Sequence, residues 1–185
     1  MADRTRQRGH MRQLAAAVLS CAFALLAAAD AQAICTGGGL GLTAPDTLTF
    51  PATTLTGNNQ SVTTTLPLTA HDRTATGTGW RLTGTSTTLT TGVYSLATTA
   101  TQVTSAARTA GTGNCAMPAN SVTYPVTLPA GTTAPAAVTL VRAASGAYSG
   151  TGPINIDLGL AIAVPGNARP GTYTSTWTLT MVSGP

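Results

Sequence analysis

The chain has 185 residues, with nine arginines, five aspartates, no lysine and no glutamate, so its formal net charge is +4. Charged residues make up only 8% of the sequence, and no basic patch or basic helix follows the N-terminal region, which argues against nucleic-acid binding through phosphate contacts. The length favours one domain.

The first 33 residues have the order of a secretory signal peptide. An apolar stretch runs from Leu14 to Ala29, and Ala31-Gln32-Ala33 supplies the small residues of a signal-peptidase site. We therefore predict cleavage after Ala33 and a secreted domain over residues 34–185. The basic region that precedes the apolar stretch contains Arg4, Arg6, Arg8 and Arg12.

Two other interpretations of this N-terminal region are open. A transmembrane anchor is disfavoured because the apolar run is short for a bilayer and ends at Asp30, next to the cleavage site. A lipoprotein processed at Cys21 would use only a seven-residue apolar region. After cleavage at Ala33 we expect no membrane span.

The predicted secreted domain has five arginines and three aspartates, hence a net charge of +2. It retains two cysteines, Cys35 and Cys115. Because an exported chain meets an oxidising compartment, we predict a disulfide between them. It would close a loop of about 80 residues, which corresponds to about 4 kcal/mol in the chain-entropy model. Two separate buried thiols are the alternative, and no zinc-type spacing is present.

Strand patterns dominate the secreted part, which is rich in β-branched threonine and valine. The clearest is Ile154–Val164, where apolar residues alternate with Asn155, Asp157 and small residues over eleven positions. In Val122–Leu128, Pro125 predicts an edge strand or a bulge. Weaker patterns cover residues 62–68, 80–82, 138–142 and 173–181.

Turn sequences rich in glycine, proline and asparagine separate these runs, for example Gly57-Asn58-Asn59 and Pro165-Gly166-Asn167. Many short strands divided by such turns predict an all-β fold, which we interpret as an immunoglobulin-like β-sandwich. The threonine-rich residues 84–115 have the poorest periodicity, so a disordered stalk is an alternative for that stretch.

Residues suited to catalysis are scarce. The secreted part holds one histidine, His71, and three aspartates, Asp46, Asp72 and Asp157, and it lacks recognisable nucleophile, phosphate-loop or zinc motifs. His71 and Asp72 are adjacent, and neighbouring strand residues point to opposite faces. We therefore predict a non-enzymatic protein without a cofactor or metal. Calcium binding by Asp72 or Asp157 is a minor alternative.

Two W-x-L tripeptides, Trp80-Arg81-Leu82 and Trp177-Thr178-Leu179, lie about a hundred residues apart. Asp72-Arg73 precedes the first, Val164-Pro165 precedes the second, and Leu48-Thr49-Phe50 lies near the start. With these contexts the chain resembles the WxL domain of bacterial cell-surface proteins. The resemblance implies secretion, non-covalent binding to the cell wall with peptidoglycan or another wall polymer as ligand, and complexes with other surface proteins.

The roles of Trp80, Leu82, Trp177 and Leu179 remain open between packed anchors of the core and a ligand-stacking face. The absence of a Leu-Pro-x-Thr-Gly sorting motif agrees with non-covalent retention. A rival function is that of a structural subunit of a surface assembly or pilus-like fibre, joined by strand addition. The glycine-rich residues 34–42 make a poor donor strand, which makes this alternative function less favoured.

Overall fold

The computed structural model describes residues 38–74, 76–111, 117, 119–145 and 151–184, and every regular element among them is a β-strand. The expected all-β class is therefore confirmed for this part of the chain. The predicted signal peptide and the predicted disulfide partners Cys35 and Cys115 lie outside the described residues.

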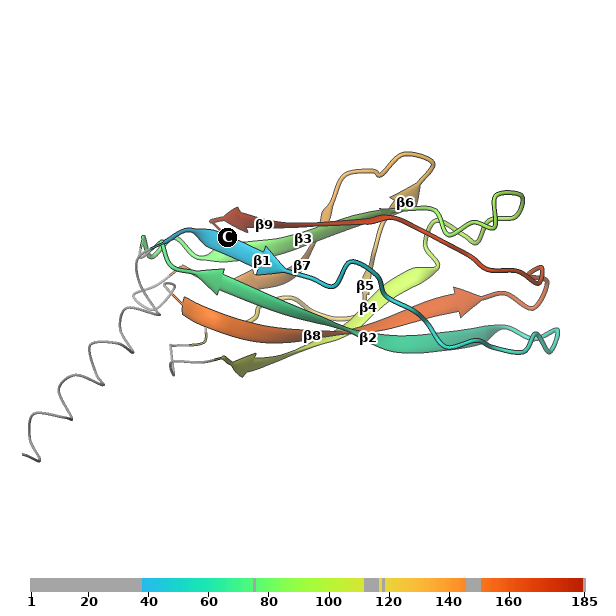
Figure 1. The fold of residues 1–185 in the computed structure, drawn as a ribbon, viewed down its shortest axis with the longest axis horizontal. Coiled ribbons are helices and arrows are strands. Elements are labelled where there is room, and N and C mark those ends of the chain that lie inside the picture. The colour runs from blue at the N-terminus through green and yellow to red at the C-terminus, as the bar shows by residue number, and fades with distance from the viewer. Residues whose placement is uncertain (1–37, 75, 112–116, 118, 146–150, 185) are drawn as a thin grey trace, which may run out of the picture.

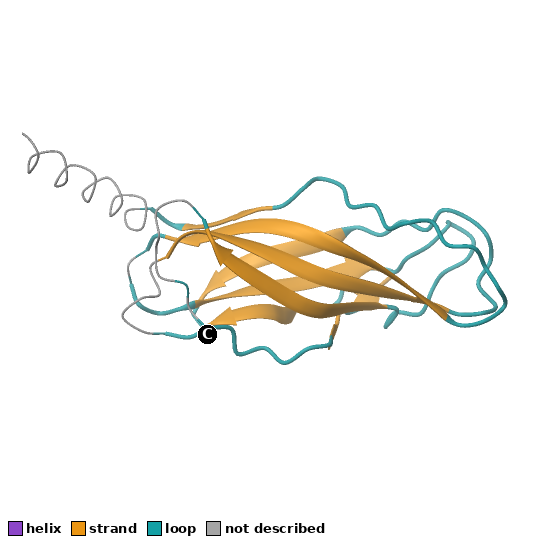
Figure 2. Cartoon of the chain, turned by 90° about the horizontal axis from the view of Figure 1, so that it is seen from below, coloured by secondary structure: helices purple, strands orange, loops and turns teal. Residues whose placement is uncertain are grey.

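The described strands form two sheets, which Figure 1 shows as two layers. The first sheet has the order β1-β2-β8-β4-β5. In the second, β3 pairs with β9 on one side, and with β7 and the short parallel β6 on the other. In Figure 2 the strands run along the long axis, and loops gather at the ends. The strands are β1 (Leu40–Thr43), β2 (Gln60–Asp72), β3 (Trp80–Thr87), β4 (Thr101–Ala110), β5 (Val126–Thr127), β6 (Ala130–Gly131), β7 (Val138–Ala143), β8 (Thr151–Val164) and β9 (Trp177–Ser183).

The core lies between the sheets, and β8 contributes most to it from the first sheet. Its alternate residues from Ile154 to Ile162 are buried, while Asn155 and Asp157 are exposed, as the period of two predicts. Leu158 is 0% exposed. Residues of the second sheet complete the same cluster, among them Trp80, Leu82 and Leu140.

The predicted run Val122–Leu128 is a strand only at Val126–Thr127, although its even-numbered residues are more buried than the odd-numbered ones throughout. Pro125 has no N–H to donate to a ladder, so hydrogen-bonded pairing begins only after it. The resulting β5 is an edge strand of the first sheet, as Pro125 indicated.

The alternative of a disordered stalk is wrong for the described part of residues 84–115. This stretch contains the end of β3 and all of β4, and Val103 is fully buried. A bulge between Val103 and Ser105 shifts the register of β4 against β8. Because a bulge changes the phase of the alternation, the sequence of β4 does not show a continuous period of two.

A short strand that the sequence did not indicate, β1, pairs with the end of β2. Gly41 lies opposite His71 in this pairing, and a Cβ built on Gly41 would lie 2.1 Å from the His71 ring. The imidazole therefore covers the backbone of β1, which only a glycine allows here.

Candidate functional site

The two W-x-L motifs lie on neighbouring antiparallel strands, β3 and β9. Trp80 and Leu82 of the first motif are both 0% exposed and belong to the core. Trp177 and Leu179 of the second are partly buried, pack against the edge of that core and line a groove. The two tryptophans therefore have different surroundings, although their sequence motifs are alike.

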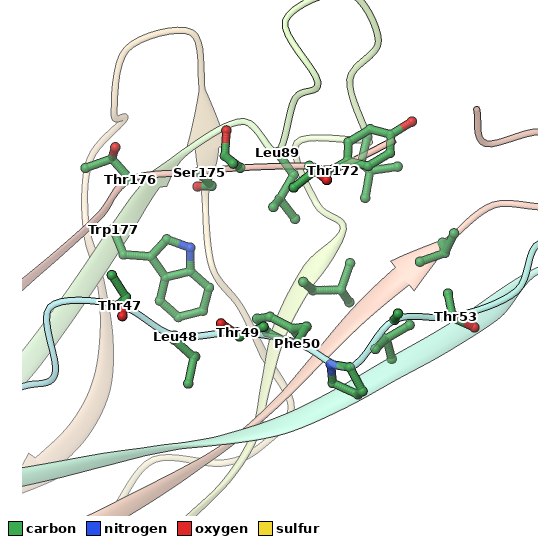
Figure 3. A pocket seen from close by; sticks show the side chains of 18 of the residues that line it. Thr47, Leu48, Thr49, Phe50, Thr53, Leu89, Thr172, Ser175, Thr176 and Trp177 are labelled. Atoms are coloured by element: carbon green, nitrogen blue, oxygen red, sulfur yellow. The ribbon is translucent and has the colours of Figure 1, made fainter. Parts of the chain in front are cut away.

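The groove opens along one side of the sandwich and has a volume of about 1240 Å³. One wall is the chain between β1 and β2, residues 44–55, and the other is the chain that leads into β9, residues 168–179. Figure 3 shows the Trp177 ring directed from the second wall toward the first, which carries Leu48 and Phe50. Leu66 of β2, Leu89 and Leu96 of the β3–β4 connection, and Ile162 of β8 add apolar surface to the lining.

The first wall is extended but belongs to no sheet. Leu48 and Phe50 are partly buried while Thr47 and Thr49 are exposed, so side chains alternate as in a strand. Even so, no backbone–backbone hydrogen bond joins residues 46–58 to another described residue. Gln60 holds this wall through its side chain, since Nε2 donates to the carbonyl of Thr54 at 3.0 Å.

The second wall presents the free edge of β9. The backbones of Thr174 and Thr176 bond toward the β3 side: Thr174 exchanges two hydrogen bonds with Thr90, and the carbonyl of Thr176 accepts from Thr87. Backbone groups alternate in direction along a strand, so those of Ser175 and Trp177 point away from β3. They have no backbone partner within the described part of the chain.

Two charged residues, Asp46 and Arg169, are found among the described residues that line the groove. Both are exposed. The Arg169 guanidinium lies 5.9 Å from the centre of the Tyr94 ring, a cation–π arrangement. In Figure 3, Thr47 lies beside Trp177, while Thr53 and Thr172 lie toward the other end. Asp46, next to Thr47, and Arg169, before Thr172, therefore mark opposite ends.

A row of hydroxyls lies at the end of the sandwich where β2 turns into β3. It begins at Asp72, whose Oδ1 accepts from the Thr74 hydroxyl at 2.6 Å and from the Thr74 N–H at 3.0 Å. Successive hydroxyl contacts of 3.0, 3.0 and 3.1 Å then link Thr74, Thr76, Thr78 and Ser183. The row ties the β2–β3 loop to the end of β9.

The remaining candidate residues from the sequence are not brought together. Asp72 is buried and faces the interior, whereas Asp157 is exposed on the outer face of the same sheet. The His71 ring lies against Gly41. Within the described ranges no group of three or more histidine, cysteine, aspartate and glutamate residues is placed to hold a metal ion. No described segment forms a helix of the length and apolarity that crossing a membrane requires.

The groove was not predicted from the sequence, although several of its residues carry the W-x-L resemblance. Leu48-Thr49-Phe50 and Trp177 were noted for the family resemblance, without any indication that they face the same space. A local hint is the pair Pro45 and Pro51, which bracket the alternating residues and keep this extended segment from completing a ladder.

A scan against protein-family models found no match, and searches of the curated proteins and of the solved structures also found none.

Proposed function

We propose that this protein is secreted through a cleaved signal peptide, residues 1–33, and is held non-covalently at the bacterial cell wall by its domain, residues 34–185. Its ligand in this proposal is peptidoglycan or a partner linked to the wall, and it acts without catalysis. The sequence resemblance to WxL domains supports membership of the WxL family. Two facing sheets with mostly antiparallel pairing support an immunoglobulin-like sandwich.

The observation that carries the proposal is the position of Trp177. This residue of the second W-x-L motif lines an open groove, while its counterpart Trp80 is enclosed in the core. An aromatic ring beside Thr176 and Ser175 offers both stacking and hydrogen bonding to a ligand. With only two charged residues among the described lining, attachment would depend little on charge.

Co-sedimentation with purified cell wall tests this function. We expect the folded protein to pellet with the wall both at low salt and at about 0.5 M salt, where charge interactions are screened within a few ångströms. Unfolded protein should stay in solution. Release of most of the folded protein at high salt would instead show simple electrostatic adhesion.

Trp177→Ala should weaken pelleting, and Thr178→Ala is the matched control. Thr178 is the next residue of β9 and is exposed on the outer face of the sheet. Equal pelleting of the two variants would exclude the groove as the retention surface.

The second candidate is a structural subunit of a surface assembly joined by strand addition. The backbone edge formed by Trp177, the first residue of β9, and by Ser175 just before it favours this function, because an unpaired edge is a template for another strand. Both candidate functions use the same groove. In the first it binds a wall ligand, and in the second it receives a strand of another subunit.

A further inference from the structure

We propose that the groove binds an extended polypeptide segment of a partner protein, which adds to the outer edge of β9 as a new β-strand. This inference rests on the function proposed above and narrows it: the wall-linked partner is a protein, and the groove receives its backbone. The inserted segment would lie between residues 44–55 and residues 168–179, the two walls of the groove.

The backbone of the second wall selects a polypeptide. The N–H and C=O groups of Ser175 and Trp177 point away from β3, along the outer edge of its sheet, and no described residue forms a backbone hydrogen bond with them. Donors and acceptors that alternate along an edge match the main chain of another extended segment. Leu179 continues the same edge, because it lies opposite Gly84 as Trp177 lies opposite Ser86.

The floor of the groove selects the side chains of this segment. Leu66, Leu89 and Ile162 add apolar surface to the lining between the two walls. A strand directs every second side chain to one face, so a segment bonded to β9 would turn alternate residues into the groove. Those residues should be apolar, and the intervening ones, which face solvent, should be polar.

The charged residues at the two ends of the groove indicate which end of an antiparallel segment should be basic and which acidic. Asp46 precedes Thr47, which lies beside Trp177 in Figure 3, and Arg169 lies three residues before Thr172, which lies toward the other end of the groove. A strand antiparallel to β9 would begin near Asp46 and finish near Arg169. The complementary segment therefore carries a basic residue before its apolar positions and an acidic residue after them.

Proline residues keep the two walls of the groove from pairing with each other as strands. Pro45 and Pro51 lie on the first wall, and Pro170 lies at the start of the second. None of them has an N–H to donate, so the two walls are poorly suited to pair with each other. The edge at Ser175 and Trp177 therefore has no backbone partner among the described residues and can accept an external strand.

A synthetic peptide of about eight residues, a usual strand length, tests the inference. Valine and threonine alternate in it, with arginine at the N-terminus and glutamate at the C-terminus. We expect saturable binding to the purified exported protein. Calorimetry and the change in Trp177 fluorescence measure this binding. The same peptide with N-methylated valines keeps its side chains but loses backbone donors, and it should bind at least about tenfold more weakly.

Leu55→Asp places a charge in the apolar lining and should abolish peptide binding. Thr56→Asp adds the same charge at the next residue, which is exposed and outside the lining, and should bind as the parent does. Because the N-methylation comparison uses the unmodified protein, it decides the matter even if Leu55→Asp fails to fold. A peptide with its two charges exchanged should bind severalfold more weakly.

Absence of saturable binding, or equal binding of the N-methylated peptide, would overturn strand addition. Displacement of the peptide by glycan fragments free of stem peptides would instead identify the groove as a carbohydrate site. Protease-treated wall separates this inference from the proposed function. The inference requires that protease treatment of the wall removes pelleting, whereas failure to pellet even with untreated wall refutes wall attachment and leaves the peptide result standing.

Discussion

Trp80 and Trp177 lie at opposite ends of the same antiparallel strand pair, where Trp80 faces Ser183 and Trp177 faces Ser86. Trp80 is 0% exposed, whereas Trp177 is only partly buried at the wall of the groove. The same tripeptide pattern therefore supplies a core anchor on β3 and a groove residue on β9.

This difference predicts unequal effects of two identical substitutions. Trp80→Ala removes a fully enclosed indole and should lower the free energy of unfolding by about 3–5 kcal/mol. Trp177→Ala should cost clearly less, because part of this side chain already contacts solvent, and it should reduce wall retention more than stability. Urea denaturation and co-sedimentation measured on the same preparations check this. Equal losses of stability would mean that Trp177 is also a core anchor.

The centre of β8 provides a second prediction. Leu158 is fully buried between β2 and β4, so Leu158→Ala should destabilise the protein by about 2–5 kcal/mol through lost burial and a residual cavity. Asp157→Ala changes the adjacent, exposed residue and should alter stability by no more than about 0.5 kcal/mol. Chemical denaturation of both variants gives the comparison. If Asp157→Ala were the more destabilising of the two substitutions, the face of β8 assigned here to the core would be the wrong one.

Tyr124 predicts a loss of stability at alkaline pH. Burial raises the pKa of its phenol, although the hydrogen bond from Asn120 and the charge of Arg108 act in the opposite direction. Tyr124 also donates to the carbonyl of Leu140. With the folded pKa above the unfolded value of about 10, this contribution is complete below pH 10 and declines as pH rises through the folded pKa.

Tyr124→Phe should therefore flatten the decline of unfolding free energy above about pH 10, while costing about 0.5–1.5 kcal/mol at neutral pH for the lost hydrogen bond. Denaturation midpoints measured from pH 8 upward test the slope. Leu158→Ala, which is destabilised but keeps the phenol, should retain the parental slope. A slope unchanged by Tyr124→Phe would rule out this residue as the source.

The predicted disulfide between Cys35 and Cys115 is tested on the secreted protein. Non-reducing peptide mapping should join the two cysteine peptides, and N-terminal sequencing should begin at Ile34. Cys35→Ser, Cys115→Ser and the double variant should be destabilised equally, by about 4 kcal/mol, because each change opens the same loop. Free thiols in freshly secreted protein would contradict the pairing.

Long, regular patterns were the part of the fold that the sequence predicted best. The alternation in β8 survives because both neighbours of this strand lie in the same sheet and its inward face is wholly enclosed. β4 was missed because its bulge after Val103 breaks the alternation, and its buried residues include Thr101. β1 was missed because four residues with a glycine carry too little pattern, and its pairing depends on distant β2.

The candidate site was predicted only in part for a related reason. Trp177 could be singled out from its motif, but its exposure depends on how far residues 44–55 stand from β9. That distance is a tertiary property, set by the packing of Leu48 and Phe50 against the main core and of Phe50 also against a second cluster that contains Ile162. No local pattern around Trp80 and Trp177 distinguishes the buried ring from the one at the groove.

The order of β8 in the sequence has a consequence for the time at which the protein gains its structure. β8 lies between β2 and β4 but follows both along the chain. In any chain that leaves a narrow channel N-terminus first, β2 and β4 would lack their main partner until residues 151–164 had emerged. Such late closure of distant contacts slows folding. A chain threaded through a secretion pore would thus stay flexible during passage and acquire its core only after nearly all of it has crossed.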